Sequence, residues 1–113
     1  MNKLIVALFF GALSVNALAA GDAEKGKALA QKYNCASCHG ADYKTPIDPS
    51  YPKLAGQHPD YLVHALTTYK RGNKAYGRVN PIMAGMVQPL SDRDMVDIAA
   101  YLANLPSGLT SQR

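Results

Sequence analysis

The chain has 113 residues, enough for one domain. Its 12 Lys and Arg and 8 Asp and Glu give a net charge of +4, and the two signs are interleaved, so no nucleic-acid partner is expected. The sequence shows no strand pairs, internal repeats or low-complexity segments, which favours an all-α fold.

Residues 1–19 have the three parts of a secretory signal peptide. Lys3 supplies the positive charge, a short apolar run follows, and Ala17 and Ala19 form an A-x-A site. We expect cleavage after Ala19 (with 1–20 as the alternative leader), which leaves residues 20–113 as the mature domain. A spanning helix needs about 20 apolar residues, roughly twice this run, so we expect a periplasmic protein without stable membrane insertion after cleavage.

A first helix is predicted over residues 23–34, with Asp22 as its N-cap. Gly26 and Ala30 lie one turn apart on its apolar face. Because both residues are small, we expect another helix to pack closely against this face.

The chemistry of the sequence is concentrated in residues 35–39, Cys-Ala-Ser-Cys-His, which contain both cysteines of the chain. In a helical turn, Cys35, Cys38 and His39 project from one side, with neighbouring Cβ atoms about 5–6 Å apart. Two thiols can add across the vinyl groups on one porphyrin edge while the imidazole binds the iron. The C-x-x-C-H pattern is typical of c-type haem attachment and predicts one haem c bound through Cys35 and Cys38, with His39 as an iron ligand.

Three other uses of this motif agree less well with the sequence. A disulfide would close a very short loop and restrain the unfolded chain little. A thioredoxin-like dithiol requires a βαβ context, and no strands are predicted. A zinc site normally takes four Cys or His ligands, and only His58 and His64 remain to complete one.

A second helix is predicted to begin at Pro59 and to end at Gly72, since proline is favoured at the first helical position and glycine after the last. Leu62, Leu66 and Tyr69 mark its apolar face.

The last helix is predicted over residues 91–105. Ser91 and Asp94 form a pattern like a capping box at its start. Leu90 and Met95 have the spacing of a hydrophobic staple.

Residues 40–57 and 73–90 show no periodicity and are predicted to be irregular. Structureless loops of about 18 residues normally count against an assignment of elements. A mature chain of about 94 residues also has difficulty burying enough apolar surface. A haem enclosed by both loops removes both difficulties, so we expect a single domain of three main helices and long loops around one covalent haem.

Five side chains could supply the second iron ligand: Met83, Met86, Met95, His58 and His64. Met95 is assigned to the staple. His58 lies near the start of the second helix, and His64 lies off the apolar face of that helix. A thioether in a loop shaped by Gly and Pro can be held over a planar cofactor, so we expect Met83, with Met86 as the alternative. A His/Met pair raises the reduction potential relative to two imidazoles and leaves no open coordination position.

Together these residues resemble a class I cytochrome c, in particular the small soluble monohaem cytochromes of bacteria and the single-haem halves of dihaem relatives. The likeness covers nearly the whole mature chain. It rests on these segments: Gly21–Lys27, Cys35–Gly40, Pro52–Gln57, Tyr61–Leu62, Asn80–Met83, Leu90–Asp92 and Ala99–Leu102.

The resemblance implies that Met83 is the distal iron ligand and that the carbonyl of Pro52 accepts the Nδ1–H of His39. It also implies that Tyr101 crosses the first helix near Gly26. The chain has no Trp, so the haem propionates need other donors. Four residues are candidates for that role, or else ordinary surface polar residues: Gln57, Tyr61, Arg78 and Asn80.

The sequence therefore predicts a monomeric electron carrier, not an enzyme, that exchanges single electrons with unidentified redox proteins. The alternatives are a haem subunit of a larger dehydrogenase or oxidase complex, and a haem catalyst with a labile sixth ligand. Docking is expected at the exposed cofactor edge, near a predicted rim of basic residues: Lys25, Lys27, Lys32, Lys44 and Lys53.

Overall fold

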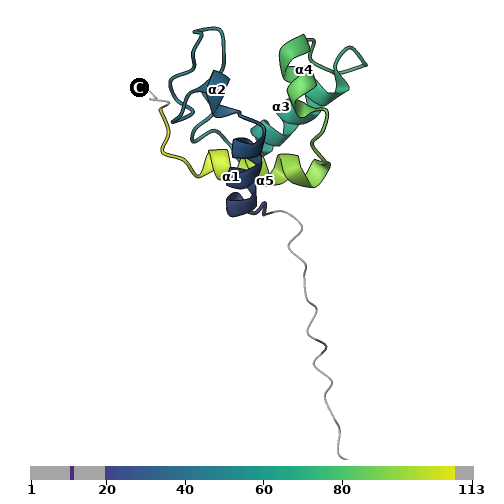
Figure 1. The fold of residues 1–113 in the computed structure, drawn as a ribbon. Coiled ribbons are helices and arrows are strands. Elements are labelled where there is room, and N and C mark those ends of the chain that lie inside the picture. The colour runs from purple at the N-terminus through teal and green to yellow at the C-terminus, as the bar shows by residue number, and fades with distance from the viewer. Residues whose placement is uncertain (1–10, 12–19, 109–113) are drawn as a thin grey trace, which may run out of the picture.

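The structure, a computed structural model, describes residue 11 and residues 20–108 (Figure 1). Except for Gly11, the predicted signal peptide lies outside the described residues. The part described is helical and contains no strand, which confirms the all-α prediction. None of its helices is both long and apolar enough to cross a membrane. The helices are α1 (Ala23–Lys32), α2 (Ala36–His39), α3 (Pro59–Arg71), α4 (Pro81–Val87) and α5 (Asp92–Ala103).

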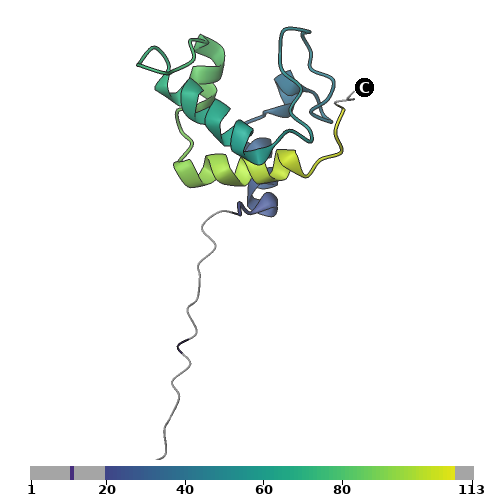
Figure 2. The same ribbon diagram turned by 180° about the vertical axis from the view of Figure 1, so that it is seen from behind.

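Helix α5 is the base on which the other elements are arranged (Figures 1 and 2). Both α1 and α3 pack against α5, and α4 packs against α3. Helix α2 and the loop of residues 40–57 lie on one side above α5, and α3 and α4 lie on the other. The three longest helices are the three predicted ones.

Helix α1 begins as predicted, because the Asp22 carboxylate accepts the backbone N–H groups of Glu24 and Lys25 at 3.0 and 3.1 Å. The helix ends two residues earlier than expected. Asn34 has a φ of 55°, in the left-handed region, and this turn redirects the chain into α2.

The crossing of α1 and α5 depends on the missing side chain of Gly26. A Cβ atom at this position would overlap the backbone carbonyl of Asp97 and lie 2.9 Å from the Cβ of Tyr101. Gly26 and Ala30 are both buried. The predictions of close packing at Gly26 and of a crossing at Tyr101 are confirmed.

A buried carboxylate also joins these two helices. Asp97 is only 2 % exposed, and its Oδ1 accepts the backbone N–H of Asp22 at 2.8 Å. The same oxygen pairs with Nε of Arg93 at 3.1 Å, one turn earlier on α5. The bond to a backbone amide and the ion pair compensate the cost of burying the charge. This contact was not predicted from the sequence.

The start of α5 matches the prediction in detail. Ser91 Oγ accepts the N–H of Asp94 at 3.0 Å, and the Asp94 carboxylate accepts the N–H of Ser91 at 3.0 Å, forming a capping box. Leu90 and Met95 are both buried in the core, as expected of a staple.

The loop of residues 40–57 is irregular, as predicted, but it is anchored by Tyr43. The carbonyl of Tyr43 accepts the N–H groups of Leu54 and Ala55 at 2.9 and 3.1 Å. Its ring meets the ring of Tyr101 edge-on, with centroids 6.0 Å apart. Burial, with smaller effects from Cys35 and Tyr101, raises the pKa of Tyr43 to about 12, so its hydroxyl is neutral at physiological pH.

The prediction that residues 73–90 form no regular element is wrong, because Pro81–Val87 form α4. The Asn80 side chain caps this helix by accepting the N–H of Met83 at 3.0 Å. Pro81 occupies the first helical position, and Val87 is buried. Seven residues including a glycine are too few to show a clear helical period, so proline and glycine were interpreted as loop residues.

We predict that Gly26→Ala lowers the free energy of unfolding by about 1–3 kcal/mol or more, because the new methyl group would force α1 away from α5. Gly85→Ala is the matched control, since a Cβ at Gly85 would meet no atom within 4 Å. That variant should be neutral or more stable by up to about 1 kcal/mol through helix propensity. Denaturant unfolding of the haem-containing proteins measures both, and equal stability of the two variants would contradict the close crossing.

We also predict that Asn80→Ala destabilises α4 by about 1 kcal/mol, because the Met83 amide loses its capping acceptor. Amide hydrogen exchange should then become faster by about fivefold in the first turn of α4. Asn80→Ser keeps a capping oxygen and should exchange at nearly the wild-type rate. If the Ala and Ser variants exchange alike, the cap does not hold this helix.

Candidate functional site

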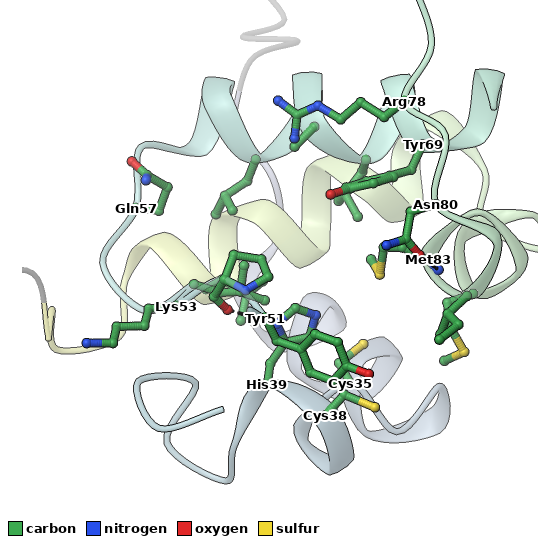
Figure 3. Close-up of a pocket in the computed structure, with 18 of the residues that line it drawn as sticks. Cys35, Cys38, His39, Tyr51, Lys53, Gln57, Tyr69, Arg78, Asn80 and Met83 are labelled. Carbon is green, nitrogen blue, oxygen red and sulfur yellow. Dashed lines mark hydrogen bonds between the residues drawn. The ribbon is translucent and has the colours of Figure 1, made fainter. Parts of the chain in front are cut away.

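A pocket of ≈ 270 Å³ lies between the two sides of the molecule (Figure 3). Helices α2 to α5 and both long loops contribute to its lining. Most of the lining is apolar, with leucines of α3 and α5 and of the first loop. The described residues that line it include no Asp or Glu. Such a pocket suits a large, largely apolar ligand.

The two cysteines lie side by side at one end of this pocket (Figure 3). Both are free thiols and half-buried, so the disulfide alternative is absent from the structure. Burial raises the pKa of Cys35, against a backbone hydrogen bond that lowers it, and the neighbouring Cys38 raises it further. Cys35 is therefore held as the neutral thiol.

His39 is buried beside the cysteines, and its ring orientation is defined. Its Nδ1 lies 2.9 Å from the carbonyl oxygen of Pro52, which confirms the contact implied by the resemblance. A carbonyl can only accept, so Nδ1 carries the proton and Nε2 has a free lone pair. Such a contact fixes the ring and increases its basicity as a ligand.

The candidates for a second ligand separate clearly in the structure. Met83 is half-buried and Met86 is 39 % exposed, and both line the pocket. Met95 is only 1 % exposed and packs in the core, as its staple position predicts. His58 is the N-cap of α3, and both it and His64 are exposed and do not line the pocket.

All four candidate partners of the propionates line the pocket. Among them, the Arg78 guanidinium lies 5.8 Å from the ring centroid of Tyr61 and 5.4 Å from that of Tyr69. The hydroxyl groups of these two tyrosines also raise the pKa of Arg78. The interaction of Tyr69 with Arg78 was not predicted, because Tyr69 had been assigned to the apolar face of α3. Its spacing of eight residues from Tyr61, about two helical turns, could have indicated a shared face.

The predicted basic rim is only partly at the pocket. Lys53 lines the pocket, whereas the other four lysines do not. Lys25, Lys27 and Lys32 are exposed on or at the end of α1, and Lys44 is half-buried in the first loop.

The residues present fit a haem and do not fit an isolated metal ion. Across residues 20–108, no group of three or more His, Cys, Asp or Glu side chains is arranged to hold a metal ion by itself. The pocket instead combines two adjacent thiols, one oriented imidazole, two thioethers and an apolar lining. A c-type haem uses these groups for attachment, axial ligation and burial of the ring.

Comparisons with known proteins point to the same cofactor. The family model for cytochrome c matches residues 23–106. Cytochrome c4 of Stutzerimonas stutzeri is 42% identical over 110 residues, covering 92% of this chain and 51% of the relative. Cytochrome c-554(548) of Halomonas halodenitrificans is 39% identical over 85 residues, covering 75% of this chain and 98% of the relative.

A solved structure supports the fold. The crystal structure of reduced recombinant cytochrome c4 from Pseudomonas stutzeri has a TM-score of 0.66 and 41% sequence identity, covering 77% of this chain and 47% of that chain. The chain thus spans about half the length of the cytochrome c4 relatives it matches. From the match over residues 23–106 and the shared fold, the chain belongs to the cytochrome c family, and its cofactor is a covalently attached haem c.

Proposed function

We propose that this protein carries single electrons between redox partners, using one haem c attached through Cys35 and Cys38, with His39 and Met83 as axial ligands. The observation that carries this proposal is the placement of an oriented imidazole and a thioether from a capped helix on one apolar pocket. His39 and Met83 would both hold the iron, and a haem bound in this way would have no coordination position left for a substrate. This supports electron transfer over catalysis.

The bound haem supplies a one-electron Fe(III)/Fe(II) couple. The protein holds both ligands in place during that exchange. Pro52 fixes the ring of His39, and the Asn80 cap fixes the backbone at Met83. The apolar lining would exclude water from a bound haem, and ligation by Met83 together with His39 would raise its potential.

The cellular location, the oligomeric state and the docking site of this carrier are also part of the proposal. The signal peptide predicted for residues 1–19 supports a periplasmic location of a mature domain of residues 20–113. The near-complete coverage of the cytochrome c-554(548) relative supports a unit of one domain with one haem, and we propose that it acts as a monomer. Redox proteins would dock near the pocket mouth, where Lys53 is exposed.

We predict that the mature protein carries one haem that acid–acetone extraction cannot remove. Intact mass should equal that of the chain from residue 20 plus one haem, and a pyridine haemochrome spectrum should show thioether-linked haem. In Cys35→Ala, one thioether is lost and the haemochrome band should shift toward that of haem with a free vinyl group. A mass equal to the bare polypeptide would contradict the attachment.

We predict that Met83→Ala loses the low-spin spectrum of the ferric protein at neutral pH, because one axial position loses its strong ligand. Met86→Ala is the matched control, one turn away on the same helix, and should retain that spectrum. The opposite result would make Met86 the ligand. If both variants remain low-spin, the second ligand is neither methionine and the proposed ligand set is wrong.

A further inference from the structure

Arg78 and Lys53 are the two cationic residues among those lining the pocket, and no acidic residue faces either of them there. In the region described, the ion pair that the structure shows is between Arg93 and Asp97, neither of which lines the pocket. From Tyr61 to Ser91 the sequence has four Lys or Arg and no Asp or Glu. A guanidinium at an apolar pocket without a carboxylate partner indicates a site for an anionic group of the ligand.

Arg78 is held at this place by α3 at two points. Its backbone N–H donates to the carbonyl of Thr68 at 2.9 Å. Its guanidinium lies over the rings of Tyr61 and Tyr69, an arrangement that cation–π attraction stabilises. The side chain therefore projects along α3 over the pocket rim instead of moving freely in solvent.

The position of Arg78 relative to the cysteines agrees with the chemistry of the cofactor. Figure 3 shows Arg78 and Tyr69 along one side of the pocket, and Cys35 and Cys38 at the opposite end. A haem has its two vinyl groups toward one edge and its two propionate carboxylates toward the opposite edge. Attachment through the cysteines thus directs the carboxylates away from them.

We propose that Arg78, steadied by Tyr61 and Tyr69, is a positioning residue that pairs with a haem propionate. This inference rests on the proposed function, because it requires haem attachment through the two cysteines. A planar guanidinium can bind a carboxylate through two parallel N–H···O bonds, which fixes orientation as well as charge.

The other polar residues of the pocket are less suited to this role. The Oε1 of Gln57 accepts the N–H of His58 at 2.9 Å, and the Oδ1 of Asn80 accepts the N–H of Met83 at 3.0 Å. Both amides are neutral and already serve local backbone contacts. Lys53 is exposed, and the ring contacts of the described residues include none that would hold it over the pocket.

Pairing with Arg78 has a measurable consequence for the iron. A propionate that loses its cationic partner leaves more negative charge near the iron, and this favours the ferric state. We therefore expect Arg78→Gln to lower the ferrous-to-ferric ratio at fixed applied potential by about two- to fivefold, the scale of a partly exposed ion pair.

The test uses the haem-containing protein and two readouts. In the ferrous wild type, NMR should show nuclear Overhauser contacts between the Arg78 side-chain N–H protons and the propionate methylene protons. In a redox titration, the ferrous-to-ferric ratio of Arg78→Lys should lie between those of the wild type and Arg78→Gln. Lysine keeps the positive charge but cannot form the two parallel N–H···O bonds of a guanidinium. Lys74→Gln is the matched control: it removes one charge from the same loop at an exposed residue that does not line the pocket, and should change the ratio by less than about 1.5-fold.

Two results would overturn the assignment: absence of Arg78-to-propionate contacts in the wild type, or an equal change in Arg78→Gln and Lys74→Gln. Intact mass and the ferric spectrum of the same samples separate this from the proposed function. Covalent haem with a low-spin spectrum but no contact rejects the role of Arg78 alone, whereas a wild type without covalent haem rejects both proposals. If Arg78→Gln does not fold, the wild-type contacts and Arg78→Lys decide the question.

Discussion

The structure depends on the close crossing of α1 over α5 at Gly26. No side chain separates the two backbones there, and the buried Asp97 fixes the start of α1 through the amide of Asp22. The haem-attachment motif follows α1 after a short turn at Asn34, so the position of α1 sets the position of α2. A small domain cannot build a large core, so placing the motif over α5 also determines where the interior lies.

Each of the two proposed axial ligands is held by a hydrogen bond to another residue. For His39 the partner is the Pro52 carbonyl, in the loop that Tyr43 anchors against α5. For Met83 the partner is the Asn80 side chain at the start of α4. Irregular loops thus contribute defined hydrogen bonds to the site, although they contain little regular structure.

Local patterns predicted much of this arrangement. The caps at Asp22 and Ser91, the staple at Leu90 and Met95 and the ends of α3 appear as expected, because each depends on a few neighbouring residues. The C-x-x-C-H motif likewise predicted a site whose main parts are adjacent in sequence.

The features that were missed depend on distant or very short segments. Helix α4 has only seven residues, and a cap plus tertiary packing stabilise it more than periodicity does. The burial of Asp97 depends on the amide of Asp22, 75 residues away, which no local pattern predicts. The contact of Tyr69 with Arg78 depends on how the chain returns to α3 at Arg78. From the sequence, the residue type and spacing of Tyr69 indicated only that it lies on the apolar face of α3.

The long span between Asp22 and Asp97 also bears on the order of assembly. A chain synthesised from its N-terminus presents residues 35–39 well before α5 has emerged. Until α5 arrives, α1 has no partner at Gly26 and the thiols are not enclosed. The topology therefore leaves an interval in which Cys35 and Cys38 are accessible before the C-terminal helix closes the domain.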